Sequence, residues 1–267
     1  MRSKFKSVFA LATAAAVMFG GVSSAIAATV GVSSVGGVWT STDPSNPPGL
    51  AGIGTNVVSW GRPVSTEKSG YSFIGAAAGQ IETGVDFNLG TFTHNNFVIQ
   101  PRTSIRGAGL GVVVKLVVGG VTQIVNAAFN FEHFETANRP RGGGCANGGR
   151  NGVGVNASGC ADRVTITDNS ATQERFVIDG FEYILEITGF TRAGQLFSAF
   201  WTEENKVNSA ILRARFTLVG PTNGGSNGEP NPNPNPTPSP VPLPAAAWMV
   251  LTGLGALAAV RAARKKA

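Results

Sequence analysis

Cysteine and histidine are scarce in this sequence, with two residues of each among 267. The two cysteines do not form a Cys-x-x-Cys pair and have no neighbouring histidine, so the usual zinc-finger and zinc-ribbon patterns are excluded. Leu-rich or Ala-rich helical stripes are missing between the two ends of the chain, which argues against a helical domain. Charged residues make up only 13% of the chain, and no catalytic constellation stands out among them. We therefore predict a protein that is not an enzyme and that needs no cofactor.

The formal net charge of +6 would suit a partner such as nucleic acid, but its distribution removes that interpretation. Seven of the 21 Lys and Arg residues lie in the first 27 and the last 27 residues. The remaining 14 lie between positions 28 and 240, together with all 15 Asp and Glu residues. This central part is nearly neutral, so we expect no nucleic-acid partner.

Residues 1–27 have the layout of a secretory signal peptide. Three cations precede an apolar stretch over residues 8–22, and the small residues Ala25 and Ala27 precede a cleavage point before Ala28. We predict that signal peptidase removes this segment and that the rest of the chain is exported.

The C-terminal residues 241–267 combine a short motif, an apolar run and a basic end. Residues 243–260 carry no charge over 18 positions, which is near the lower limit for a helix that crosses about 30 Å of hydrocarbon. Four cations follow and favour a cytoplasmic C-terminus. We predict a single transmembrane helix, preceded over residues 221–240 by a Pro/Asn-rich stalk in an extended, semi-rigid conformation.

The start of this tail resembles the VPLPA variant of the PEP-CTERM sorting signals. The residues that carry the resemblance are Val241, Pro242, Leu243, Pro244 and Ala245. The resemblance implies an exosortase, a membrane-embedded cysteine transpeptidase, as a processing partner that cuts at the motif and passes the protein to the cell surface. The protein would be anchored in the inner membrane before this step, and a permanent, uncleaved anchor is the alternative.

Between residues 28 and 220 the dominant pattern is an alternation of apolar and polar residues with a period of two. Val85, Phe87 and Leu89 alternate with polar neighbours, and residues 212–218 alternate in the same way. Residues 110–118 are almost wholly apolar, which suits a strand covered on both faces. The dipeptide Asp179-Gly180 predicts a tight hairpin. We predict one all-β domain, an antiparallel β-sandwich of jelly-roll-like or immunoglobulin-like type, with about ten short strands.

Residues 138–159 are rich in Gly and Asn and cannot form a stable helix or strand, so they are predicted to be a long surface loop. Cys145 and Cys160 lie in and next to this loop. Two nearby cysteines in an oxidising compartment favour a disulfide, which would contribute roughly 3 kcal/mol by closing a loop of about 15 residues. A metal site is the weaker alternative.

The sequence Phe92-Thr93-His94-Asn95-Asn96-Phe97 resembles the Thr-His-x-Asn motif of a family of PEP-CTERM surface proteins, with Thr93, His94 and Asn96 as the motif residues. Segments around Cys145 and Cys160 resemble the choice-of-anchor K domain. Together the two resemblances cover most of residues 36–219. They imply an anchored, extracellular β domain, and they bring no catalytic or binding residue with them.

The two histidines are the clearest candidates for metal ligands or a general base. His133 shares a predicted strand face with Phe129 and Phe131, which favours a packed structural role. His94 is predicted to be a turn residue whose ring bonds a neighbouring backbone carbonyl. Calcium is a second possibility, because Glu132, Asp162 and Asp168 could supply oxygen ligands, although solvated loop acids explain them equally well.

Three tryptophans lie in the predicted domain, Trp39, Trp60 and Trp201. A core position is the first interpretation, and stacking on sugar rings at an exposed position is the alternative. The leading functional prediction is an exported surface protein with a structural or adhesive role in the envelope or in an extracellular biofilm matrix. The runner-up is a carbohydrate-binding module for exopolysaccharide, with or without calcium.

Overall fold

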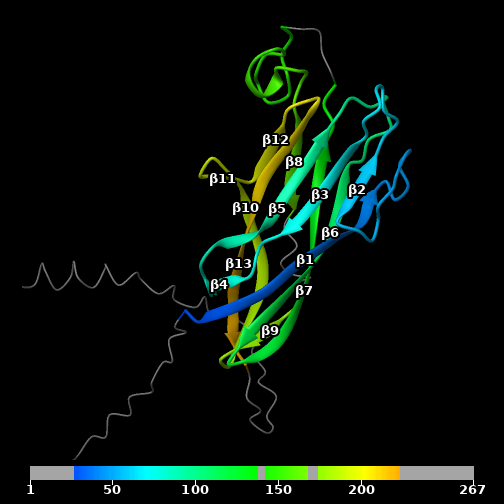
Figure 1. The fold of residues 1–267 in the computed structure, drawn as a ribbon. Coiled ribbons are helices and arrows are strands. Elements are labelled where there is room, and N and C mark those ends of the chain that lie inside the picture. The colour runs from blue at the N-terminus through cyan, green and yellow to red at the C-terminus, as the bar shows by residue number, and fades with distance from the viewer. Residues whose placement is uncertain (1–26, 138–141, 168–173, 223–267) are drawn as a thin grey trace, which may run out of the picture. The chain divides into compact units, whose positions relative to one another are not determined.

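The structure is a computed structural model that describes residues 27–137, 142–167 and 174–222 (Figure 1). Ala27 and Ala28 lie directly before the first strand, whereas Ala25 and the rest of the predicted signal peptide fall outside these ranges. The stalk from residue 223, the sorting motif of Val241, Pro242, Leu243, Pro244 and Ala245, and the predicted transmembrane helix also fall outside them. Within the described ranges no helix is long and apolar enough to cross a membrane.

The described chain is all-β, as the alternating pattern predicts. Its single short helix is a 3-10 turn, η1 (Gly154–Asn156). The strands are β1 (Thr29–Asp43), β2 (Val57–Trp60), β3 (Ser69–Gly75), β4 (Gly79–Glu82), β5 (Phe87–Asn96), β6 (Gly107–Val118), β7 (Val121–Phe134), β8 (Asp162–Thr167), β9 (Phe176–Ile178), β10 (Phe181–Arg192), β11 (Gln195–Phe197), β12 (Ala199–Thr202) and β13 (Lys206–Pro221).

These strands form two sheets, and every pairing in them is antiparallel. Sheet A has the order β12-β8-β7-β6-β1-β4, and sheet B has the order β11-β10-β13-β5-β3-β2, with β9 paired to β10. The prediction of an antiparallel all-β domain is confirmed. Several strands are longer than predicted, and β13 alone spans 16 residues.

Alternation along the strands decides which side chains enter the space between the sheets. In β7 the odd-numbered residues from Val125 to His133 are buried, and the even-numbered residues face outwards. The prediction that residues 110–118 are covered on both faces is wrong, because Val113, Lys115 and Val117 of β6 lie on the solvent side. Only one face of sheet A packs on sheet B, so an apolar run is not proof of a doubly covered strand.

The hairpin predicted at Asp179-Gly180 is confirmed. Both residues have positive φ, 48° for Asp179 and 82° for Gly180, and they join β9 to β10. This pair of positive φ values matches the twist of the flanking strands, and glycine adopts it without steric cost.

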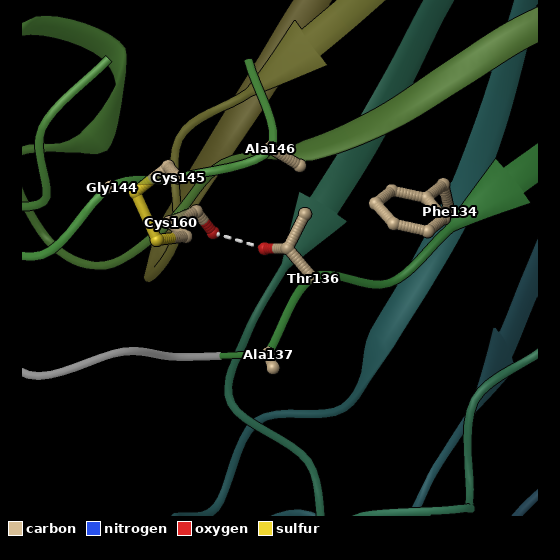
Figure 2. Close-up of a pocket in the computed structure, with 7 residues that line it drawn as sticks. All are labelled: Phe134, Thr136, Ala137, Gly144, Cys145, Ala146 and Cys160. Carbon is tan, nitrogen blue, oxygen red and sulfur yellow. Dashed lines mark hydrogen bonds between the residues drawn. A yellow bond between two sulfur atoms is a disulfide. The ribbon is translucent and has the colours of Figure 1, made fainter. Parts of the chain in front are cut away.

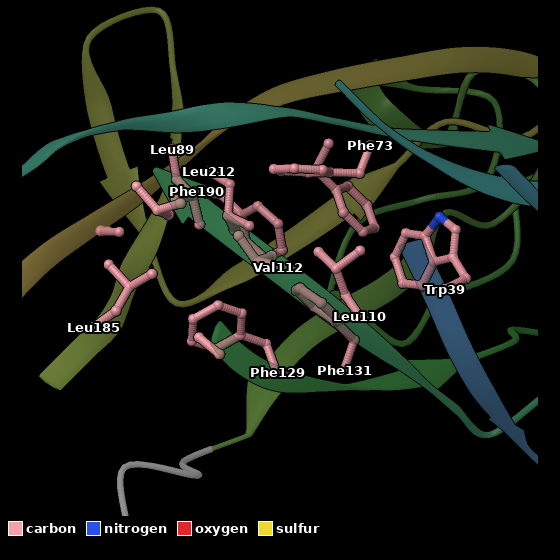
Figure 3. Packing of buried hydrophobic residues seen from close by; sticks show 14 of the residues in the cluster. Trp39, Phe73, Leu89, Leu110, Val112, Phe129, Phe131, Leu185, Phe190 and Leu212 are labelled. Carbon is pink, nitrogen blue, oxygen red and sulfur yellow. The ribbon is translucent and has the colours of Figure 1, made fainter. Parts of the chain in front are cut away.

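Aromatic and aliphatic side chains together fill the core between the sheets (Figure 3). Trp39 is fully buried, and its ring centroid lies 5.3 Å from that of Tyr71, 6.0 Å from Phe92 and 5.9 Å from Phe131. Trp39 and Phe131 belong to sheet A, whereas Tyr71 and Phe92 belong to sheet B. Hydrophobic contact between these rings therefore contributes to holding the two sheets together.

Candidate functional site

The disulfide predicted between Cys145 and Cys160 is present, with a Cα–Cα distance of 5.4 Å. It closes the long loop, in which η1 is the only regular element that the structure describes. Asn156 anchors the loop from inside: its side-chain oxygen accepts hydrogen bonds from the amide of Asn147 (3.0 Å) and from the backbone N–H of Ala161 (2.9 Å). The loop has its own internal bonding and is tied to the start of β8.

A shallow pocket of about 280 Å³ lies beside the disulfide (Figure 2). At its floor the Thr136 hydroxyl donates a 2.7 Å hydrogen bond to the carbonyl of Cys160. The lining residues are Phe134, Thr136, Ala137, Gly144, Cys145, Ala146 and Cys160. Neither the two histidines nor an acidic side chain lines this pocket, so it offers a contact surface rather than acid–base chemistry.

Next to this pocket three side chains form a row on the outer face of sheet A. Phe134 of β7 pairs in register with Arg163 of β8, and Arg163 pairs with Trp201 of β12. The Arg163 guanidinium carbon lies 5.4 Å from the Phe134 ring centroid and 5.8 Å from that of Trp201. We call these three residues the outer ladder. Its Phe134 is 42% exposed, and Trp201 is half-buried.

Trp39 and Trp60 lie in the core, in agreement with the first interpretation, and the sugar-stacking alternative is wrong for both. Both have 0% exposure, because their positions fall on the inward faces of β1 and β2. A ring enclosed by other side chains cannot stack on a sugar. Of the three predicted tryptophans, Trp201 alone reaches the outer surface of the domain.

A second group of polar residues lies inside the domain, between the two sheets. His94 and Asn96 come from β5 of sheet B, whereas His133, Asp162 and Thr202 come from β7, β8 and β12 of sheet A. All five are buried, with exposures between 0% and 4%. We call them the inter-sheet cluster. One ring nitrogen of each histidine and one carboxylate oxygen of Asp162 lie within 4.8 Å of one another.

The Thr202 hydroxyl fixes the orientation of the His94 ring. It donates its single hydrogen to the carbonyl of Asp162 (3.2 Å) and lies 2.9 Å from His94 Nδ1. Since the hydroxyl hydrogen is already used, we assign the proton to His94 Nδ1, which donates it to the Thr202 oxygen. His94 Nε2 is then an unprotonated nitrogen with a lone pair, and it has no hydrogen-bond partner among the described residues.

Asp162 is held by only one of its two carboxylate oxygens. Oδ1 accepts from the Thr136 backbone N–H at 2.8 Å and from the Thr136 hydroxyl at 3.1 Å. Oδ2 is buried and has no partner in the described part of the chain. The side-chain oxygen of Asn96 is likewise buried without a partner in the described part of the chain, while its amide nitrogen donates to the carbonyl of Thr202 (3.1 Å).

The His133 ring has a polar neighbour at each of its two nitrogens. Its Nδ1 lies 2.6 Å from the hydroxyl of Tyr71, and its Nε2 lies 3.4 Å from Oε2 of Glu135, which is longer than a normal hydrogen bond. The aromatic rings of Trp60 and Tyr71 seal the two histidines: Trp60 lies 5.4 Å from His133, and Tyr71 lies 5.0 Å from His94, centroid to centroid.

Burial and neighbouring charges shift the pKa values of His94, Asp162 and Tyr71 so that each group favours its uncharged form. Burial lowers the pKa of His94 well below its ordinary value, and the neighbouring His133 lowers it further. Burial raises the pKa of Asp162, and the negative charges of Glu135 and Glu204 add to this rise, against an opposing effect of the Thr136 hydrogen bonds. Burial also raises the pKa of Tyr71, so its phenol stays protonated.

The predicted roles of the histidines and the acids change accordingly. His94 is a fully buried strand residue bonded to a side chain from the opposite sheet, so the prediction of a turn residue is wrong. The structure does not bring together the predicted calcium ligands, because Glu132 faces solvent and Asp162 faces the core, while Asp168 lies outside the described residues. His133 lies on the inward face of β7, as predicted.

The Thr-His-x-Asn motif divides between the two faces of β5. His94 and Asn96 point into the inter-sheet cluster, whereas Thr93 points outwards and its hydroxyl lies 2.9 Å from that of Ser209. Sequence reasoning missed Tyr71, Thr136 and Thr202 as cluster partners. The available signal was that Phe92, His94 and Asn96 share one strand face, which places two polar residues in line with an aromatic core residue.

No family model matches this chain, and no curated protein matches it either.

Proposed function

We propose that this protein is an exported, non-catalytic β domain that is sorted to the cell surface and acts there through structural or adhesive contacts. The proposal joins two parts of the chain. The signal peptide and the VPLPA-type tail, with signal peptidase and exosortase as processing partners, supply delivery. The domain, which we propose to be a sandwich of jelly-roll-like or immunoglobulin-like type, supplies the contact surface.

The observation that supports a contact role is the outer ladder beside the disulfide pocket. Phe134, Arg163 and Trp201 present apolar rings around one cation on an open sheet face. Aromatic and Arg residues are the types that contribute most to binding at protein surfaces. A shallow, flat surface of this kind suits an extended partner better than a small substrate.

Surface sorting is tested by mass spectrometry of the C-terminus in separated membrane and extracellular fractions. We expect the extracellular form to end at or near the motif of residues 241–245. An intact Lys265-Lys266-Ala267 end in every fraction would contradict processing by an exosortase.

The contact role is tested by cell attachment and biofilm assays with surface-displayed variants. We expect Phe134→Ala together with Trp201→Ala to reduce attachment, because both rings of the outer ladder are lost. Ile124→Ala is the matched control, since Ile124 is an exposed apolar residue on the outward face of the same strand as Phe134. Equal attachment by the double variant and the control would count against the outer ladder as the contact surface.

Binding of exopolysaccharide is the second candidate, and the exposed part of Trp201 is the observation that favours it. Aromatic rings on a sheet face can stack on sugar rings, and the neighbouring Arg163 can donate hydrogen bonds to hydroxyl or carboxylate groups. Pull-down with the polysaccharide of the producing cell should be lost in Trp201→Ala and retained in Ile124→Ala. Turnover of a polysaccharide by the purified protein would instead overturn the non-catalytic proposal.

A further inference from the structure

We propose that the inter-sheet cluster binds one divalent transition-metal ion of the zinc type, with His94, His133 and Asp162 as its protein ligands. The site is separate from the outer ladder, and it does not depend on the proposed surface function. Three features of the described residues carry the inference: unpartnered donor atoms, the anchoring of each ligand, and the local charge.

The first feature is a set of buried side-chain atoms that carry a lone pair and have no hydrogen-bond partner among the described residues. His94 Nε2, Asp162 Oδ2 and Asn96 Oδ1 are all buried without a hydrogen-bond partner among the described residues. Leaving such atoms unsatisfied costs roughly 1–3 kcal/mol each, so a folded protein retains them where something occupies the space between them. Two of them belong to the three residues whose ligand atoms lie within 4.8 Å of one another.

That spacing is close to what a metal ion requires. In a tetrahedral site, bonds of about 2.0–2.2 Å to nitrogen and oxygen place the ligand atoms roughly 3.3–3.6 Å apart. Atoms separated by up to 4.8 Å therefore need to approach one another by up to roughly 1.5 Å, which rotations of the three side chains share between them.

The second feature is that one polar atom of each ligand residue is hydrogen-bonded to a neighbouring side chain or backbone group. His94 is held through Nδ1 by Thr202, at 2.9 Å, and His133 through Nδ1 by Tyr71, at 2.6 Å. Asp162 is held through Oδ1 by Thr136, at 2.8 Å. Metal sites in proteins have this arrangement, because the outer hydrogen bond orients the ligand and selects the histidine tautomer.

The third feature is charge. Asp162 has 0% exposure, and Oε2 of the Glu135 carboxylate lies 3.4 Å from Nε2 of the neighbouring ligand His133. Burying carboxylates without a counter-charge is costly, and a divalent cation offsets that cost.

The ligand types select the metal and its role. Two imidazoles with one carboxylate favour zinc and its neighbours over calcium, which takes oxygen ligands. The three ligands have exposures of 0%, 4% and 0%, so no route leads a substrate to an open coordination position. The ion is structural, because it joins His94 of sheet B to His133 and Asp162 of sheet A. Asn96 Oδ1, which is buried without a hydrogen-bond partner among the described residues, is the candidate for a fourth ligand.

The test uses the full chain, expressed with its own signal sequence, exported, and purified without chelator. We expect about one zinc per chain by inductively coupled plasma mass spectrometry, with slow release to a chelator because the site is sealed. Replacement by Co²⁺ should give the intense visible absorption of a four-coordinate ion. Added Ca²⁺ should change neither the cobalt spectrum nor the unfolding temperature.

The ligand variants are His94→Gln and Asp162→Asn, which preserve side-chain size, and Asp86→Asn is the matched control. Asp86 is a partly buried carboxylate that pairs with Arg215 outside the cluster. We expect the two ligand variants to bind zinc at least tenfold more weakly and the control to bind it as the unchanged protein does. Thr202→Val keeps all three ligands and removes the support of His94, so a ten- to hundredfold weaker affinity is expected.

Two results would overturn the inference. One is an exported protein that binds less than a tenth of an equivalent of zinc or cobalt, even after titration, in which case a buried water fills the space instead. The other is unchanged zinc affinity in His94→Gln and Asp162→Asn. If these variants fail to fold, the stoichiometry and the cobalt spectrum of the unchanged protein decide the question alone.

Discussion

Replacing Trp39 and Trp201 separately by alanine distinguishes residues that hold the sheets together from residues that present a surface. Trp39 is fully buried and contacts aromatic rings on both sheets, and its Nε1 donates a 3.2 Å hydrogen bond to the carbonyl of Asn56. Trp201 is half-buried on the outer face and lies beside Arg163. The same chemical change therefore acts on two different environments.

For Trp39→Ala, truncation of a buried aromatic residue costs about 3–5 kcal/mol. Loss of the hydrogen bond to Asn56 adds about 1 kcal/mol. A total of about 4–6 kcal/mol is a large part of the 5–15 kcal/mol that usually stabilises a domain, and it corresponds to a fall in Tm of roughly 8–24 °C. For Trp201→Ala, the cation–π contact at a partly exposed site accounts for about 1 kcal/mol or less.

The assay is urea and thermal unfolding followed by circular dichroism, with the free energy of unfolding extrapolated to water. We expect Trp39→Ala to lose several times more stability than Trp201→Ala, and Trp39→Phe to fall between them. Similar losses for the two alanine variants, or a loss below about 1 kcal/mol for Trp39→Ala, would refute the assignment of Trp39 to the core.

Three further predictions concern the disulfide, the glycines and pH. Replacing both Cys145 and Cys160 by Ser should lower the free energy of unfolding by about 3 kcal/mol, and adding a reductant should reproduce most of that loss in the unchanged protein; denaturant titrations measure both. Gly75→Ala should cost about 1–3 kcal/mol, because its Cβ would lie 2.0 Å from the carbonyl oxygen of Val35, whereas Gly36→Ala, with nothing within 4 Å, should be nearly neutral in the same titration. Because the folded state raises the pKa of Tyr71 above its ordinary value near 10, the folded protein keeps this proton longer than the unfolded chain does. The stability that Tyr71 contributes is therefore complete below about pH 10 and is lost as pH rises above it. The free energy of unfolding should consequently fall less steeply with rising pH in Tyr71→Phe than in the unchanged protein. Phenolate absorbance and unfolding midpoints, both measured against pH, check this.

The fold class could be predicted from the sequence because it depends on local patterns. Alternation over residues 87–89 and 212–216 predicts which side chains face inwards, although Val85 and Leu218, at the ends of these patterns, are exposed. Asp179-Gly180 predicts where a hairpin turns. The pairing of Cys145 with Cys160 was predictable because only two cysteines are present. These features require no knowledge of which strands become neighbours.

The inter-sheet cluster could not be predicted, because its members meet only through the order of the strands. His94 and Thr202 are 108 residues apart, and Tyr71 and His133 are 62 residues apart. Nothing local distinguishes Asp162 from a solvated acid such as Glu132, and burial makes the difference. For Trp39 and Trp60 the local pattern was sufficient: the core position that was the first interpretation agrees with their 0% exposure, and only the sugar-stacking alternative was wrong.

The position of the disulfide has a consequence for when the protein matures. Cys160 lies two residues before Asp162, and the carbonyl of Cys160 and the carboxylate of Asp162 both accept hydrogen bonds from Thr136. In a reducing cytoplasm the cysteines stay apart, so the beginning of β8 lacks its covalent tether. If the chain is exported as proposed, we expect this end of the domain to reach its final packing only outside the cytoplasm, so that formation of the disulfide would link complete folding to export.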